Sequence, residues 1–437
     1  MSVLLFLLLF VPVSLLLAWW VAEGNDRALL IRRTTVAWIV LAPLTAVMNE
    51  WMPFTGGGDD ENYFDLAQPP PASLAEALDL SRFQGSMEQP GYPALLSMLN
   101  ALVGHDLLAY KLLNLFLLIA LSLVWYRVGL SLENRRFGRA ASLAVLAITP
   151  LWFYVFALRK DMLIALLQSL FLLGVIEAWR QIRLVPMLVM ATVSVGVVTL
   201  RSALLVQQVG VLVGSVLVRR WSGGVRKGRL IVPVTLLLMA GLGLAASTNR
   251  TFLGLLGIET EYRVASTDML EHVSEYERTG VAATAAFPVV YLLSETAGLN
   301  PKSWIQLDSA WLRGTLALPW ILLVVPSLML GLRYLVTATN GPISARRSAW
   351  YSIASFRRSR ALSTPWCAVL LFVGSYVAIS FLVGDTTRWR TPDMPMTAAI
   401  AVAGWVYTVP AIRNRVIVWW VISIGSLFSL LSLFRGV

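Results

Sequence analysis

The sequence predicts an all-α integral membrane protein, with about twelve transmembrane helices in a single domain over residues 1–437. Hydrophobic residues make up 57% of the chain and charged residues only 14%, too few to cover a water-soluble globule of this size. The mean hydropathy is +0.72. A bilayer core about 30 Å thick is crossed by roughly 20 apolar residues in a helix, and apolar runs of this order recur along the whole chain.

The apolar runs that lie between charged loops are the expected spans. They cover residues 3–22, 35–52, 107–128, 140–156, 162–178, 184–199, 202–218, 230–247, 312–334, 365–383, 394–411 and 416–434. The first run has no basic segment before it and no small-residue cleavage pattern after it, so we expect a retained span rather than a signal peptide. The run at 184–199 is short, and it either spans the membrane or is re-entrant.

The charged residues predict the orientation. When the loops are assigned alternately to two sides, most of the 35 Lys and Arg residues fall on one side, together with only four of the 24 acidic residues: Glu23, Asp26, Glu133 and Glu177. Cytoplasmic loops are enriched in Lys and Arg. We therefore expect a multi-pass protein of a bacterial inner membrane, with both termini and the acidic loops facing the periplasm or exterior. The net charge of +11 then reflects orientation, and no nucleic-acid partner is expected.

Two outer loops are long enough to fold. The first, 53–106, contains an acidic cluster, a segment at 72–80 that is predicted to be helical, and an amphipathic run that ends at Val103. The second, 248–311, is rich in charged and aromatic residues and contains an apolar stretch, 281–293, that is too short to span and is expected to lie in the membrane interface. Both loops are therefore expected to contain short interfacial helices.

The acidic cluster Asp59-Asp60-Glu61 directly follows three glycines. A carboxylate held beside apolar surface and other carboxylates has its pKa raised toward neutrality, as a general base requires. The adjacent Asp59 and Asp60 would point in different directions, and a helix starting here would place Tyr63 on the same face as Asp60. The alternative interpretation is a solvated acidic loop with no chemical role.

Basic residues on the outer side run against the usual charge bias, so they suggest a bound anion. Arg159-Lys160-Asp161 occupies a very short outer turn, Arg388 and Arg390 lie two residues apart, and Arg201 lies in another tight turn. Such side chains suit a phosphate, and the arginines can fork onto it. A lipid phosphate fits best, because many spans surround this outward-facing site. The alternatives are a local ion pair and cations that extend to the interface.

Several other site classes are not indicated. The sequence contains no phosphate-binding glycine loop, no G-x-S-x-G motif and no Cys/His cluster. His105 and His272 are isolated and are interpreted as surface residues, and Cys367 lies alone in an apolar run. Carboxylates and phosphate oxygens suit Mg²⁺ or Mn²⁺, so Asp59, Asp60 and Asp161 are the candidate ligands if a metal is used, although their spacing does not demand one.

In order along the chain, these motifs resemble the GT-C superfamily of polytopic glycosyltransferases, which use polyprenyl-phosphate-linked sugars. Asp60-Glu61-Asn62-Tyr63 resembles the acidic motif of the first outer loop, where the family has its catalytic carboxylate, and Pro90-Gly91-Tyr92-Pro93 is similar to the segment that follows it. Arg159-Lys160-Asp161 resembles the second acidic outer loop, and Arg388-Trp389-Arg390-Thr391-Pro392 the late Arg-x-Arg-x-Pro signature. The resemblance covers about residues 55–180 and 384–405.

The resemblance implies transfer of a sugar or oligosaccharide from a polyprenyl-phosphate or polyprenyl-diphosphate donor on the outer face, in cell-envelope polysaccharide or glycolipid synthesis. Asp60 would be the catalytic base, with Asp59 as the second candidate. The residues expected to bind substrate are Glu61, Tyr63, Glu88, Tyr92, Arg159, Lys160, Asp161, Arg201, Arg388 and Arg390.

Two alternative functions remain open. The segment Glu88-Gln89-Pro90-Gly91 stands where the GT-C family commonly has His-Pro-Pro, and it also resembles polymerases of exopolysaccharide and O-antigen repeat units. A flippase or transporter of lipid-linked saccharides is the other alternative. Transporters place charge near the middle of spans and contain inverted repeats, whereas here charge gathers at the outer ends and no repeat is evident.

Overall fold

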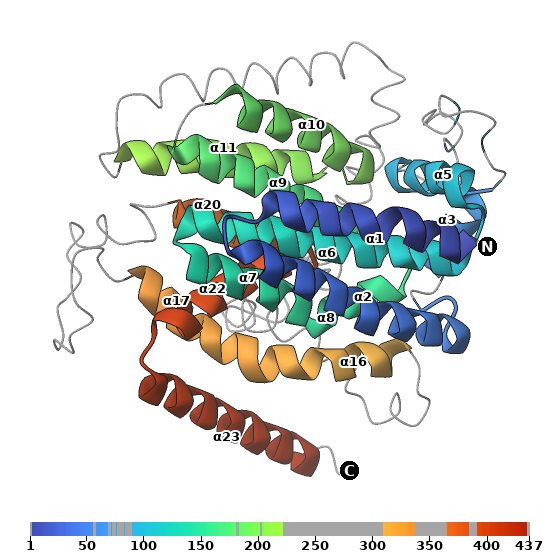
Figure 1. Cartoon of the computed structure of the whole chain (residues 1–437). Helices are drawn as coiled ribbons and strands as arrows, with labels where there is room; N and C mark the ends of the chain where they lie inside the picture. Colours follow the sequence, from blue (N-terminus) through green and yellow to red (C-terminus); the bar gives the residue numbers. More distant parts are fainter. Residues whose placement is uncertain are drawn as a thin grey trace.

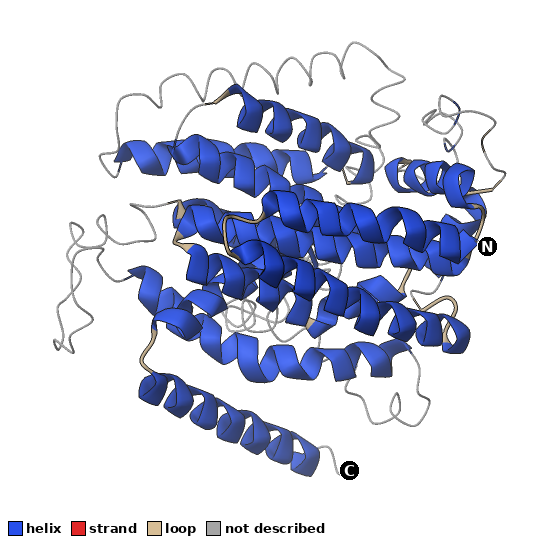
Figure 2. Cartoon of the chain, viewed as in Figure 1, coloured by secondary structure: helices blue, strands red, loops and turns tan. Residues whose placement is uncertain are grey.

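The structure is a computed structural model that describes residues 2–55, 58–68, 71, 76, 83, 90–180, 183–201, 203–221, 309–336, 365–383 and 391–434. All regular secondary structure in these residues is helical (Figure 2), which confirms the all-α expectation. The α-helices are α1 (Ser2–Val21), α2 (Asp26–Trp51), α3 (Gly58–Leu66), α5 (Gly91–Val103), α6 (Leu107–Leu132), α7 (Arg135–Ala147), α8 (Thr149–Phe156), α9 (Asp161–Arg180), α10 (Leu184–Leu200), α11 (Ala203–Trp221), α16 (Ser309–Pro319), α17 (Val325–Val336), α20 (Trp366–Val383), α22 (Met394–Tyr407) and α23 (Pro410–Phe434).

Five described helices are long and apolar enough to cross a bilayer. They are α1, α2, α6, α9 and the continuous Thr315–Val336 segment, in which a π-helical turn, Trp320–Val324, joins α16 to α17. The pair α7 and α8, bent by 51°, counts as a sixth if it is one broken span. The described residues therefore contain five or six helices with the length and composition of membrane spans, which is consistent with an α-helical membrane protein.

The long helices lie side by side, with α6 at the centre in contact with α1, α2, α7 and α9 (Figure 1). The short helices α3 and α5 lie at one end of this bundle, on the side where the N-terminus lies. Helix α23 lies at the edge, where it contacts α17 and the π-helical turn and donates a hydrogen bond from Trp420 Nε1 to the Ile321 carbonyl at 2.9 Å.

The outer helices expose large apolar side chains. On α1 these include Leu8 and Trp20, and on α2 they include Ile39, which is 67% exposed. The same is true of Leu184 on α10 and Trp419 on α23. Apolar surface on so many helices would aggregate in water but suits contact with lipid tails. The exposed apolar side chains thus agree with a membrane protein.

Local sequence explains how α6 begins and how it meets α7. Gly104, at φ +90°, makes the turn after α5, and the Asp106 carboxylate then accepts hydrogen bonds from the backbone amides of Leu108 and Ala109. At the far end of α6, Gly129 and Gly138 let the two backbones touch, because a Cβ atom built on Gly129 would lie 2.6 Å from the Gly138 Cα. The α6 helix is therefore fixed at both ends.

A network of ion pairs lies at the end of the bundle opposite α3. The buried Asp26 carboxylate pairs with Arg139 and accepts a hydrogen bond from the Tyr126 hydroxyl at 2.7 Å. Arg127 pairs with Glu23 at 2.7 Å nearby. Two of the four acidic residues assigned to the basic side are therefore paired with arginines from that same side.

Several expected boundaries are wrong: α6 ends at Leu132 rather than at residue 128, α23 begins at Pro410 rather than at residue 416, and three other differences are informative. Helix α2 begins at Asp26 rather than at residue 35, because its first turns carry the charged residues that an apolar window excludes. The expected span 140–156 is broken after Ile148, where Pro150 lies in the first turn of α8. Helix α22 ends at Tyr407 rather than at residue 411.

The long loop at 53–106, which was expected to face outward, contains α3 and α5, as expected for a loop with short helices. The expected helix at 72–80, apart from residue 76, and the expected span 230–247 lie outside the described residues. So does almost all of the second long loop, 248–311, in which only the start of α16 is described.

Candidate functional site

The acidic cluster forms the first turn of α3. Asp59, Asp60 and Glu61 all lie in this turn, where carboxylates interact favourably with the positive end of the helix dipole. The helix turns Asp60 and Tyr63 inward, so that both are buried, whereas Glu61 is exposed and Asp59 is partly exposed. The two aspartates differ in burial, since Asp60 is fully buried and Asp59 is not.

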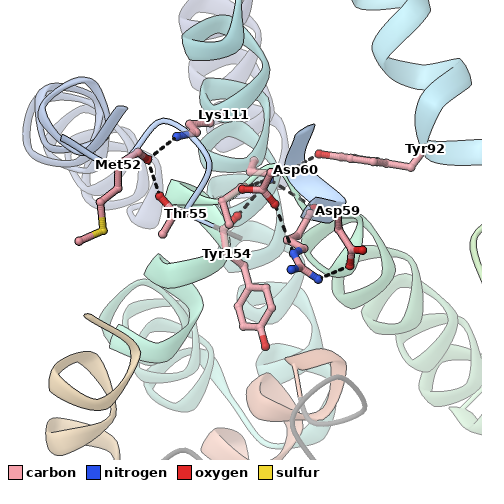
Figure 3. Close-up of polar contacts among 10 residues, drawn as sticks. Met52, Thr55, Asp59, Asp60, Tyr92, Lys111 and Tyr154 are labelled. Carbon is pink, nitrogen blue, oxygen red and sulfur yellow. Dashed lines mark hydrogen bonds and ion pairs between the residues drawn. The ribbon is translucent and has the colours of Figure 1, made fainter. Parts of the chain in front are cut away.

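Arg159 bridges the two aspartates from the turn between α8 and α9. Its Nη1 atom lies 2.5 Å from Asp59 Oδ2, and its Nε atom lies 3.3 Å from Asp60 Oδ1 (Figure 3). The Arg159 side chain is 16% exposed and that of Asp60 0%. A buried carboxylate is tolerated when a cation pairs with it, so this guanidinium accounts for the burial of Asp60.

Asn114 of α6 positions the turn that carries Arg159. Its Nδ2 atom donates to the carbonyls of Tyr154 at 3.0 Å, Ala157 at 2.8 Å and Arg159 at 3.3 Å. Its Oδ1 atom accepts a hydrogen bond from the Tyr92 hydroxyl of α5 at 3.2 Å. One buried side chain thus joins the end of α8, the Arg159 turn and α5.

Tyr63 and Tyr92 stack edge to face beside the carboxylates, with ring centroids 5.0 Å apart. Burial raises the pKa of Tyr63, as do the charges of Asp161 and Asp59, while Arg201 and Arg159 lower it. Burial also raises the pKa of Tyr92 well above its ordinary value. Both phenols are therefore protonated at neutral pH, and the charge of Asp161 acts on both rings.

A second buried ion pair lies next to this cluster. Arg201, at the end of α10, places Nη2 3.6 Å from Oδ1 of Asp161, which is in the first turn of α9. Both side chains are less than 10% exposed. The charges of Asp161 and Arg201 act on Tyr63, so the structure brings together Asp59, Asp60, Tyr63, Tyr92, Arg159, Asp161 and Arg201, as the sequence predicted.

Of the remaining predicted site residues, two are described and three are not. Lys160 is partly buried beside Arg159, and Glu61 faces outward. Glu88, Arg388 and Arg390 lie outside the described residues. The described residues contain no group of three or more His, Cys, Asp or Glu side chains that could hold a metal ion, and Asp161 pairs with Arg201 rather than joining Asp59 and Asp60.

His105 is not a simple surface residue. Its ring lies 4.0 Å from that of Phe64, between centroids, and its Nδ1 atom lies 3.0 Å from the Tyr110 hydroxyl. Burial lowers the pKa of His105, while the charges of Asp65 and Asp106 raise it. His105 is therefore partly buried, and it packs α3 against the start of α6; His272 lies outside the described residues.

Sequence reasoning missed three buried polar residues near this site: Lys111, Asn114 and Asp393. Lys111 and Asn114 lie inside an apolar run, where averaging hydrophobicity over a window hides single polar residues. Their spacing of three residues, which puts them on one helix face, is a signal that could have found them. Asp393 closes the short turn Thr391–Asp393, which contacts α9.

The chain was also compared with known proteins. No family model matches it, and neither a curated protein nor a solved structure shows significant similarity to it.

Proposed function

We propose that this protein is a membrane glycosyltransferase that moves a sugar or oligosaccharide from a polyprenyl-phosphate or polyprenyl-diphosphate donor to an acceptor at the outer membrane face. The observation that supports this most is the Asp60 carboxylate, which is fully buried at the start of α3 and held by Arg159. Charged groups in membrane proteins are costly and tend to mark functional sites. A carboxylate of this kind can accept a proton from an acceptor hydroxyl.

The proposed reaction needs little chemistry from the protein. The acceptor oxygen attacks C1 of the donor sugar, and the proton of that hydroxyl moves to Asp60. The bond between C1 and the phosphate oxygen breaks, and its electron pair leaves with the polyprenyl phosphate or diphosphate. Because negative charge grows on this leaving group, fixed cations beside it lower the barrier.

The cations proposed for this role are Arg159, Lys160, Arg388 and Arg390. The turn Thr391–Asp393, which follows Arg390 in the sequence, contacts α9, the helix that starts at Asp161. This contact supports grouping the late arginines with the Arg159 turn. Arg390→Ala should lose roughly 2–4 kcal/mol of transition-state stabilisation, as for one preorganised donor, and Arg390→Lys should recover only part because lysine cannot fork.

The proposal includes the finer topology. Twelve spans would place α3, α5 and both termini outside a bacterial inner membrane and the ion network of Asp26 and Arg139 inside. The described structure supports this in one respect: the acidic site and the arginine-rich network lie at opposite ends of α6. Lys111 and Asn114, near the start of α6, contact the acidic site, whereas Tyr126 and Arg127, near its end, belong to the network.

Purified protein in vesicles tests the proposal. The probes are polyprenyl phosphate that carries one tritiated hexose and polyprenyl diphosphate that carries a tritiated oligosaccharide, offered with total envelope acceptors. We expect protein-dependent cleavage of the bond between sugar and phosphate, and loss of this activity in Asp60→Asn. Lengthening of a lipid-linked saccharide would identify a repeat-unit polymerase, whereas movement of intact donor across the bilayer without cleavage would replace the proposal with a flippase.

A further inference from the structure

Lys111 lies in the second turn of α6 with none of its side chain exposed. Burying an ammonium group inside an apolar span is costly unless it is paired. The described structure gives this lysine a hydrogen-bond partner in the segment before the acidic cluster, and the carboxylate of Asp60 in that cluster acts on its charge.

The first partner is the end of α2. Lys111 Nζ donates a hydrogen bond to the Met52 carbonyl at 3.3 Å, and the Thr55 hydroxyl donates to the same oxygen at 2.7 Å. Met52 directly follows α2, which ends at Trp51, and α3 begins at Gly58. The lysine therefore holds the start of the short connection between α2 and α3, the helix that carries Asp59 and Asp60.

Asp60 is a second, electrostatic influence. Its carboxylate acts on the charge of the Lys111 ammonium, and in the view of Figure 3 Lys111 and Tyr92 flank Asp60. Arg159 reaches the same carboxylate from the turn between α8 and α9. Asp60 is thus influenced by two cations that come from two different elements.

Charges of both signs gather in this part of the site. The carboxylates of Asp59, Asp60 and Asp161 lie among the cations Arg159, Arg201 and Lys111. Replacing Lys111 by a neutral residue would take one of these positive charges away from Asp60. It would also remove one of two anchors on a single face of α6, since Asn114, three residues later, holds the Arg159 turn.

We infer that Lys111 is a positioning residue for Asp60: it ties the Met52–Thr55 turn to α6 and places a second positive charge opposite the buried carboxylate. The inference rests on the proposed function only where it treats Asp60 as the catalytic base. The claim that Lys111 positions the α2–α3 connection does not depend on the proposed function. The competing account is that Lys111 merely stabilises helix packing, as interhelical hydrogen bonds do in membranes.

Three substitutions separate these accounts. Lys111→Met removes both the hydrogen bond and the charge, Lys111→Gln keeps a donor for Met52 without the charge, and Lys111→Arg keeps both in a different shape. The single native cysteine, Cys367, is buried, so a Cys367→Ala background allows a spin label at the exposed position Asn62→Cys on α3. A label at Arg136→Cys, exposed at the start of α7, is the matched control.

We expect Lys111→Met to increase the motion of the label at position 62 and not at position 136. In a transfer assay, kcat should fall by about tenfold to a hundredfold, the effect of a misplaced reacting group, with donor KM nearly unchanged. Lys111→Gln should restrain the label again while kcat stays low, and Lys111→Arg should recover both in part.

The label is read without turnover, so the two proposals can fail separately. A mobile label at position 62 in a protein with no transferase activity would reject the proposed function and support the positioning role. An unchanged label and full turnover in Lys111→Met would overturn the inference, and so would equal loosening at both label positions. Should Lys111→Met fail to fold, the Gln and Arg variants decide, because full kcat in Lys111→Gln would contradict a role for the charge.

Discussion

Arg159 Nε lies 3.3 Å from Oδ1 of Asp60, a carboxylate with no exposed surface, while Nη1 of the same guanidinium lies 2.5 Å from the partly exposed Asp59. One cation from the turn before α9 thus holds two carboxylates from the start of α3. The three side chains come from segments 100 residues apart in the chain, so the site depends on the packing of α3 against the bundle.

This arrangement makes Arg159 important for stability. Arg159→Met should destabilise the protein by about 3–5 kcal/mol, because it leaves a buried carboxylate without its cation. Unfolding in a mild detergent measures the change. The same substitution at Arg127, whose ion pair with Glu23 is 38% and 48% exposed, should cost no more than about 1 kcal/mol. Equal costs at both positions would contradict the geometry.

Asn114 is expected to contribute more to the free energy of unfolding than an ordinary hydrogen-bonding residue of a membrane span. Asn114→Leu removes the donor to three carbonyls and the acceptor for Tyr92, so it should cost about 2–4 kcal/mol. The control is Ser122→Ala on the same helix, which breaks a buried contact with Ser142 and should cost about 0.6 kcal/mol, a usual value for such bonds in membranes. Similar losses in both variants would argue against a central role for Asn114.

His105 should make stability depend on pH. Its pKa in the folded protein is lowered, chiefly by burial, so the folded state favours the neutral ring and the unfolded state binds the proton more readily. The stability that this provides is present above the unfolded pKa of about 6.5 and is lost as the pH falls through the folded pKa. Wild type should therefore lose stability on acidification from about pH 7 to pH 5. His105→Gln should flatten the curve, and identical curves would count against this assignment.

The proposed orientation is tested by labelling cysteines in intact cells. In a Cys367→Ala background, Glu61→Cys on α3 should react with an impermeant maleimide, and Arg136→Cys at the other end of the bundle should react only after the cells are opened. Both side chains are exposed in the structure, so a failure to react reports the membrane side. The reverse pattern would invert the topology.

The sequence predicted the site better than it predicted the boundaries of the helices. The acidic turn of α3, the inward direction of Tyr63 and the gathering of Arg159, Asp161 and Arg201 all followed from charge placed at the ends of apolar runs. Charge in such places is costly enough that its position carries information.

The failures have physical reasons too. Lys111 and Asn114 were hidden because an apolar window averages them with about 20 neighbours, although each contacts backbone carbonyls of another segment. The start of α2 was missed because its first turns are stabilised by ion pairs and not by lipid. The break between α7 and α8 lies beside Pro150, and the Thr149 hydroxyl at the start of α8 donates to the Leu316 carbonyl. A contact between residues so distant in sequence cannot be predicted from the sequence alone.

The central claim is that Asp60 is the base in a sugar transfer, and the most direct test measures turnover and donor binding in the same variants. Asp60→Asn keeps the size and hydrogen bonding of the side chain but removes its basicity, so turnover should fall by about two to four orders of magnitude while binding of the polyprenyl-phosphate donor persists. Asp59→Asn should cost less, and Asp65→Asn, exposed on the same helix, should behave as wild type. Near-normal turnover in Asp60→Asn with an inactive Asp59→Asn would assign the role to Asp59, and full turnover in both would remove this helix from catalysis.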